Sequence, residues 1–188
     1  MKLIQILCLF MLIPVSAFSQ EEKEHFKFKG IEINGTLDEF ASRLENVGFS
    51  PTGDESVFKG QFAGDDCNIY IMTTKGGLVY SVCAVRSKKS TWASLKLDYK
   101  TLKEGYINKY GTPLVDVHRF SSPYYEGDGY EITAVRTKKV IYMSSWHLDN
   151  GSITEIILDD CSVALYYTDN INDAINESEK KKQFSDDL

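Results

Sequence analysis

The clearest pattern in the chain is an apolar residue at every third or fourth position between residues 36 and 48, which predicts an amphipathic helix. Its apolar positions are Leu37, Phe40, Ala41, Leu44 and Val47. Thr36 and Glu39 stand three residues apart, as in a capping box, and Gly48 is the residue type that commonly ends helices. We therefore expect a helix that begins after Thr36 and ends at Gly48.

The same spacing after Ser90 predicts a second, longer helix. Its apolar positions are Trp92, Leu95, Tyr99, Leu102 and Tyr106. This helix is expected to end at Gly111, with Pro113 just beyond it. Asp128 could cap a third, short helix that runs to about Lys138, and we prefer this to a strand. Residues 113–127 before it read as an irregular connection.

Alternating apolar and polar residues predict strands in the remaining segments. A first strand covers Phe26 to Ile33 and is broken by Gly30. Asn150-Gly151 is typical of a two-residue hairpin turn, and Asp159-Asp160 is expected to form a second tight turn. The further strands are expected at about 57–62, 67–73, 78–86, 140–148, 153–158 and 161–168.

Together these elements predict an α+β fold in which helices pack on one face of an antiparallel sheet. One single domain is expected over residues 20–182, with two helix-plus-three-strand halves at about 26–113 and 114–169. A short polar helix beyond Asp169 would lead into a disordered tail at 183–188. The triplet Asp-Asp-Cys occurs at 65–67 and 159–161, which either chance or an internal duplication explains.

The first nineteen residues have the pattern of a cleaved signal peptide. Lys2 precedes an apolar run from Leu3 to Val15, and small residues stand before an expected cut at Gln20. This run is shorter than the roughly twenty apolar residues of a spanning helix, so no membrane span is expected. We expect the mature chain to be a soluble domain in the periplasm or outside the cell.

The charge balance argues against nucleic acid as a partner. Removal of residues 1–19 would take away Lys2 and no acid, leaving 20 basic against 27 acidic residues and a net charge of −7. Phosphate binding needs a concentrated basic face. No glycine-rich phosphate loop follows a predicted strand, so no nucleotide or other cofactor is expected.

Three cysteines would remain in the mature chain. If the hairpin folds about Lys75, Cys67 lies opposite Cys83 at a separation that a disulfide can span. A slip of one residue would place Ala84 there and leave the two cysteines on opposite faces. Cys161 is expected on a buried face, where its thiol would be inert.

The strands of the second half should carry apolar residues on both faces. One face would hold Met143, Ile156, Leu158, Cys161, Val163, Leu165 and Tyr167, as a core does. The opposite face would hold Tyr142, Trp146, Ile153, Ile157 and Tyr166. Either helices or the first half cover this aromatic face, or it is a binding surface built around Tyr142, Trp146 and Tyr166.

Candidate catalytic groups are few. His25, His118 and His147 lack the spacing of a zinc site, so no metal is expected, and they are interpreted as surface residues. Acidic residues cluster at Asp65-Asp66, at Glu126 to Glu131 and at Asp159-Asp160, where they suit turns and caps. A contact of His118 with Asp116 or Glu126 inside a cleft would favour an enzyme.

Several motifs resemble those of uncharacterised small secreted proteins of Gram-negative bacteria. They are Phe58-x-Gly60, Phe62-x-Gly64, the helix that ends in Lys109-Tyr110-Gly111-x-Pro113, and Tyr167-x-Asp169. In its order of elements the chain is also similar to the β-lactamase-inhibitor-protein fold and to outer-membrane assembly lipoproteins, although it lacks their lipid-acceptor cysteine. These folds imply protein binding and no known catalytic residues.

Two functions follow as hypotheses. The first is an exported binding module that contacts a protein or an envelope component. The second is a small hydrolase outside the cytoplasm that uses acidic residues or His118. An enzyme should present a concave site with convergent polar groups, whereas a binding module should present a flat or shallow patch.

Overall fold

An eight-stranded sheet runs through the molecule in the order β3-β4-β5-β6-β10-β9-β8-β7, and all neighbouring strands are antiparallel. The computed structural model describes residues 24–187, so the predicted signal peptide lies outside the described residues. The strands are β3 (Ser50–Pro51), β4 (Val57–Phe62), β5 (Asp65–Thr73), β6 (Val79–Arg86), β7 (Val115–Phe120), β8 (Val140–His147), β9 (Gly151–Ile157) and β10 (Val163–Asp169). The predicted α+β class with an antiparallel sheet is confirmed.

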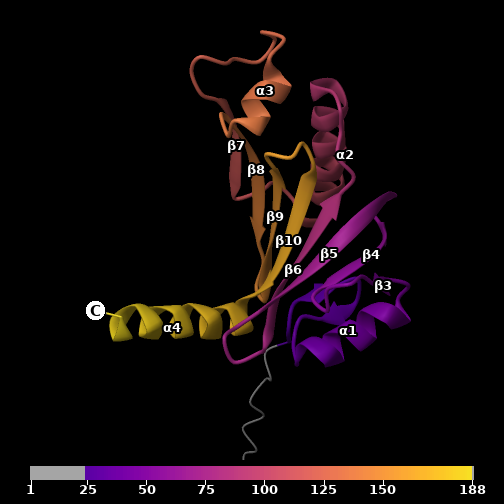
Figure 1. Cartoon of the computed structure of the whole chain (residues 1–188), viewed down its shortest axis with the longest axis vertical. Helices are drawn as coiled ribbons and strands as arrows, with labels where there is room; N and C mark the ends of the chain where they lie inside the picture. Colours follow the sequence, from indigo (N-terminus) through magenta and orange to yellow (C-terminus); the bar gives the residue numbers. More distant parts are fainter. Residues whose placement is uncertain (1–23, 188) are drawn as a thin grey trace, which may run out of the picture.

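Two units of four strands, each preceded by a helix, build this sheet, and they meet where β6 pairs with β10 (Figure 1). Helix α1 (Leu37–Asn46) precedes β3 to β6, and α2 (Trp92–Tyr110) precedes β7 to β10. Three strands were expected in each half, and the structure adds one edge strand to each, β3 in the first unit and β7 in the second. Helix α2 packs on β9 and β10, although the sequence placed it in the first half. The Asp-Asp-Cys triplets occupy non-equivalent positions, one at the start of β5 and the other in the β9–β10 loop.

Helices α1 and α2 begin and end where the sequence predicts. The hydroxyl of Thr36 accepts a hydrogen bond from the amide of Glu39, whose carboxylate accepts one from the amide of Thr36. This is the predicted capping box. Thr91 caps α2 through the amide of Ser94, and Gly111 follows the helix with a φ of 82°. A positive φ is readily adopted only by glycine, which explains the end of α2.

The predicted first strand is instead a small hairpin outside the main sheet. Strand β1 (Lys27–Phe28) pairs with β2 (Ile31–Glu32), and Lys29 and Gly30 between them have φ values of 48° and 82°. Two consecutive positive φ values suit a tight hairpin turn. The expected third helix is the short α3 (Glu131–Arg136). It begins without a side-chain cap, because Asp128 accepts hydrogen bonds from the backbone amides of Tyr125 and Tyr130 instead.

One face of the sheet, here called the covered face, packs against α1, α2 and the β1–β2 hairpin. Aromatic and aliphatic side chains from all these elements form one continuous core. Its largest fully buried members include Trp146, Tyr99, Phe28, Phe40, Phe58, Ile69 and Leu165. Within this core Phe28 lies 5.1 Å from Tyr167 and 5.2 Å from Phe62, measured between ring centroids. The N-terminal hairpin therefore packs against strands of both units.

The turn between β9 and β10 is wider than predicted, and this reverses the faces of β10. Val163 pairs with Ile157 across a five-residue loop, in which Cys161 has a φ of 68° and Asp160 accepts hydrogen bonds from Ser162. A tight turn at Asp159-Asp160 would have shifted this register by one residue. Because side chains alternate along a strand, one residue moves every side chain to the other face.

The corrected register divides the predicted aromatic face. Tyr142 and Trp146 lie on the covered face together with Ile153, Ile157 and Leu165, and they are only 4% and 2% exposed. Helix α2 covers them, so of the two readings of this face the structure supports the covered one. Tyr166 lies on the opposite face and is half-buried.

The Cys67–Cys83 pairing, which one register of the hairpin would have allowed, is absent. Cys67 lies opposite Arg86, and Cys83 lies opposite Tyr70, because the β5–β6 turn is longer than expected and a bulge follows Met72. The two thiols therefore lie on opposite faces of the sheet, and Cys67, Cys83 and Cys161 are all free and buried. Burial raises the pKa of Cys67 to about 11 and that of Cys83 to about 12, which makes both poor nucleophiles.

Helix α4 (Asn170–Asp186) follows β10 directly and extends away from the sheet (Figure 1). Its N-cap is the buried Asp169, whose carboxylate accepts hydrogen bonds from the backbone amides of Asn172 and Phe26. The side-chain amide of Asn172 donates to the carbonyl oxygens of Ile33 and Val79. The tail that was predicted to be disordered from residue 183 is helical as far as Asp186. Within residues 24–187, no helix has the length and apolar character needed to cross a membrane.

Candidate functional site

The face of the sheet opposite α1 and α2, here called the open face, carries an unbroken apolar row across five strands. Successive cross-strand partners in this row are Val85 (β6), Ala164 (β10), Ile156 (β9), Met143 (β8) and Val117 (β7). Except for the small Ala164, each of these side chains is half-buried. With strands about 4.8 Å apart, the row is about 19 Å long.

A second row beside it adds two aromatic side chains. Here Tyr70 lies opposite Cys83, which in turn lies opposite Tyr166. Tyr70 is 40% exposed, and Tyr166 is half-buried. The sheet face of an antiparallel protein that meets only water normally carries polar residues at these positions. Beyond Tyr166 the second row continues with the polar residues Thr154 and Ser145. The first row and the aromatic part of the second form a contiguous apolar patch, which typically marks an interaction surface.

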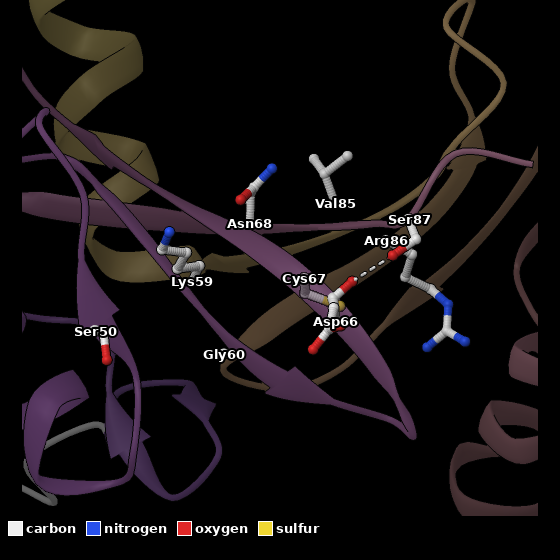
Figure 2. A pocket seen from close by; sticks show the side chains of 9 residues that line it. All are labelled: Ser50, Lys59, Gly60, Asp66, Cys67, Asn68, Val85, Arg86 and Ser87. Atoms are coloured by element: carbon white, nitrogen blue, oxygen red, sulfur yellow. Dashed lines mark hydrogen bonds between the residues drawn. The ribbon is translucent and has the colours of Figure 1, made fainter.

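The first apolar row ends at Val85 beside a shallow, polar depression near the β3 edge of the sheet (Figure 2). It measures about 540 Å³. Lys59, Asn68 and Val85 are successive cross-strand partners that line it. In Figure 2 the side chains of Asn68 and Val85 point to one side of the sheet and that of Arg86 to the other. The hydroxyl of Ser87 donates to the carbonyl oxygen of Asp66 at its rim, 3.2 Å away.

Positive charge is in slight excess on the open face. Lys59 and Arg119 are exposed at its two edges. Among the described strand residues, Asp66 is the acidic residue on this face. His147 adds an imidazole at the end of β8. The chain as a whole has a formal net charge of −6. The strand residues of the open face therefore carry one net positive charge, opposite in sign to the formal net charge of the chain.

Sequence reasoning found only Tyr166 of this surface. Tyr70, Met143, Ile156 and Val85 were missed, because the sequence does not reveal which of two apolar faces the helices cover. The alternation of Ile141, Met143 and Ser145 with Tyr142, Ser144 and Trp146 was the available signal, since it showed that both faces of β8 are partly apolar.

A second candidate site is a pocket of about 700 Å³ between α2, β7, β8 and the loop 121–130. Its lining residues are Lys96, Tyr99, Lys100, Lys103, Glu104, Ile107, His118, Phe120, Tyr124, Tyr125, Glu126 and Tyr142. Concave sites that combine aromatic walls with a few convergent polar groups commonly bind ligands. Sequence reasoning named only a possible contact of His118 with Asp116 or Glu126 here, because residues 113–127 were expected to be irregular and not to form a strand.

His118 lines this pocket and contacts Asp116, one of the two acids considered for it. Its Nε2 lies 3.2 Å from Asp116 Oδ1 and 3.4 Å from the hydroxyl of Tyr99, and its ring stacks on Tyr142. Burial and the charge of Lys103 lower the pKa of His118. The imidazole is therefore neutral at pH 7, and the contact with Asp116 favours a proton on Nε2.

Asp116 belongs to a small hydrogen-bonded network. It accepts two hydrogen bonds from Lys103 Nζ, at 2.7 and 2.6 Å, and one from Ser144 Oγ at 2.8 Å. The hydroxyl of Tyr99 lies 2.7 Å from the same serine oxygen. Burial alone would raise the pKa of Asp116, but these hydrogen bonds outweigh it and hold the pKa below its usual value. Asp116 is thus ionised at neutral pH.

Glu126 fixes the loop 121–130 over the pocket. Its carboxylate accepts hydrogen bonds from Lys96, from the indole of Trp92 at 3.3 Å and from the hydroxyl of Tyr142 at 3.1 Å. The bond from Lys96 is the main reason that the pKa of Glu126 is lowered. Burial raises the pKa of Tyr142 to about 12, so this tyrosine remains a hydrogen-bond donor.

These groups suit binding better than bond cleavage. A hydrolase needs a base together with an acid or a nucleophile, and paired carboxylates serve only when their pKa values are pushed apart. Asp116, which contacts His118, and Glu126, which lines the pocket, both have lowered pKa values. Ser144 is fully buried beneath the pocket. The described residues around the pocket thus offer a neutral imidazole as a base but no exposed serine or cysteine beside it.

Comparison with known proteins gives no further guide to this site. No protein-family model matches the chain, and neither a curated protein nor a solved structure matches it significantly.

Proposed function

We propose that this chain is an exported binding module that holds a partner protein on the open face of its sheet. The observation that carries the proposal is the apolar row from Val85 to Val117, which crosses five strands with no break. The apolar area that these half-buried side chains still expose is costly in water, and a partner would remove it from water. Tyr70 and Tyr166 beside the row supply the aromatic contacts that dominate protein interfaces.

The chemistry of the face indicates the chemistry of the partner. A complementary surface would be apolar at its centre and acidic at its rim, where it would meet Lys59 and Arg119. A second copy of this chain fits less well, because two open faces placed against each other would bring basic rims together. The proposed occupant is therefore a different protein with an acid-rimmed apolar patch.

Photocrosslinking from the open face tests this proposal. A benzophenone amino acid placed at Tyr70 should form one dominant adduct with another protein when the chain is expressed in its native cell. The same group at Leu97, which is exposed on the outer side of α2, is the matched control and should not form this adduct. A crosslinked dimer of the chain, or equal adducts from both positions, would contradict the proposal.

Once crosslinking has identified the partner, the affinity of the chain for that purified protein provides a quantitative test. Ile156→Asp places a charge in the middle of the apolar row and should weaken binding at least tenfold, because an unpaired charge would be buried at the interface. Leu97→Asp should leave the affinity unchanged. Equal affinities for the two variants would contradict the proposed face.

Export is proposed from residues 1–19. If these residues are a cleaved leader, the protein recovered from the periplasm or the medium begins at Gln20. Amino-terminal sequencing of that protein measures this, and an intact start at Met1 in the cytoplasmic fraction would contradict it.

A hydrolase at the α2–β7 pocket is the second candidate, because His118 Nε2 lies 3.2 Å from Asp116 inside a concave site. Such an enzyme would lose its turnover in His118→Gln while the melting temperature stayed near that of the original protein. Equal turnover by both proteins, on ester and glycoside reporter substrates, would reject this candidate.

A further inference from the structure

The charges that line the α2–β7 pocket compensate one another. Lys96 pairs with Glu126 and Lys103 pairs with Asp116. Lys100 and Glu104 lie one helical turn apart on the rim, where their charges oppose each other over a short distance. An anionic or cationic ligand would have to compete with these built-in counter-charges. The pocket therefore suits a ligand without net charge.

The polar atoms that remain free favour hydroxyl groups. Nε2 of His118 faces Asp116, Tyr99 and, at 3.5 Å, Lys103 Nζ, whereas Nδ1 has no hydrogen bond to any residue in the described part of the chain. In the neutral tautomer that the contact with Asp116 favours, Nδ1 accepts a hydrogen bond. Glu126 receives three donors, and a carboxylate has about four acceptor positions, so one is open to a ligand hydroxyl.

The walls of the pocket are aromatic and held in place. Trp92 packs edge-on against both Phe120 and Tyr142, with ring centroids 5.4 and 5.2 Å apart, which fixes the orientation of these two rings. Tyr125 lines the mouth of the pocket from the loop 121–130 and is 65% exposed. The electron-rich face of an aromatic ring attracts the slightly positive C–H groups of a sugar ring.

We propose that this pocket binds a short neutral oligosaccharide. One sugar face stacks on the aromatic wall, and the hydroxyl groups hydrogen-bond to His118 Nδ1 and to Glu126. The volume of about 700 Å³ lies within the usual range for ligand sites. This site lies on the side of the sheet that carries α2, so the inference is independent of the partner proposed for the open face.

Ligand-observed NMR tests the inference with named sugars. Maltose, cellobiose and N,N′-diacetylchitobiose serve as neutral probes, and digalacturonate serves as the charged one. At least one neutral disaccharide should receive saturation transfer from the protein, and digalacturonate should receive less. Transfer to none of the neutral sugars, or stronger binding of digalacturonate, would overturn the proposal.

Two tyrosines of one loop provide matched variants for the sugar that binds. Tyr125 lines the pocket, whereas Tyr130 is equally exposed, at 64%, and does not line it. Tyr125→Ala should raise the dissociation constant about fivefold through loss of stacking, and Tyr130→Ala should leave it unchanged. Both side chains are largely exposed, so both variants should fold. Equal effects of the two substitutions would overturn the assignment of the pocket.

Discussion

Glu155 provides the sharpest test of how α2 covers the sheet. It lies in the middle of β9 on the covered face, fully buried, between Ser144 and Leu165 on the neighbouring strands. Neither carboxyl oxygen has a hydrogen-bond partner in the described part of the chain. Burial raises the pKa of Glu155 to about 9, so the folded protein keeps this carboxyl protonated and neutral at pH 7.

The sign and size of the effect follow from proton linkage. An unfolded glutamate has a pKa of about 4.3. Between about pH 4.3 and pH 9 the folded chain therefore binds one proton more than the unfolded chain at Glu155. The stability that the protonated group contributes is fully present below the unfolded pKa of about 4.3. It is lost at about 1.4 kcal/mol per pH unit as the pH rises toward the folded pKa of about 9.

Glu155→Gln removes this titration while keeping the size of the side chain. The free energy of unfolding of the variant, relative to that of the original protein, should rise by about 4 kcal/mol between pH 5 and pH 8. Urea unfolding at each pH unit measures the difference. Glu45→Gln, on the exposed side of α1, is the control and should show a nearly constant difference. A constant difference for Glu155→Gln as well would refute the burial of Glu155 beneath α2.

Three further predictions concern the helices and the thiols. Thr36→Ala should lower the free energy of unfolding by about 1 kcal/mol through loss of the capping box, and an unchanged urea midpoint would mean that α1 does not depend on it. Trp92→Ala should cost about 2 kcal/mol, because this half-buried ring packs against Phe120 and Tyr142. Alkylation of unfolded protein that begins at Gln20 should add three groups under non-reducing conditions, and a single addition would indicate that two of Cys67, Cys83 and Cys161 are bridged.

The helices could be predicted from the sequence because their signals are local. The capping box at Thr36 and Glu39 and the glycine at Gly111 act through backbone groups within a few residues. Each reports a conformation that does not depend on the rest of the fold. The boundaries of α1 and α2 were therefore found, together with the α+β class.

The faces of the sheet could not be predicted, because they depend on turn lengths. Asp159-Asp160 is typical of a tight turn, but Cys161 adopts a positive φ and the loop is longer. The longer loop shifts the register between β9 and β10 by one residue. That single step exchanged Tyr166 with Leu165 between the two faces. The β5–β6 hairpin failed in the same way, since the bulge after Met72 separated Cys67 from Cys83.

The pocket escaped prediction for a different reason. Strand β7 has the alternating sequence Val115-Asp-Val117-His-Arg-Phe120, but as an edge strand it is exposed on part of both faces and its pattern is weak. Without that strand, His118 and Asp116 had no common surface to share. As a strand, β7 places the two residues on the same side, two positions apart, and the pocket around them depends on α2, β7 and β8 meeting in three dimensions.

The central claim is that the open face binds a partner protein, and hydroxyl-radical footprinting of the native complex tests it most directly. Met143 and Tyr166 should be oxidised in the isolated protein and protected in the complex, while Tyr125 and Phe184 should react equally in both. Protection of Tyr125 or Phe184 without protection of Met143 and Tyr166 would contradict the account.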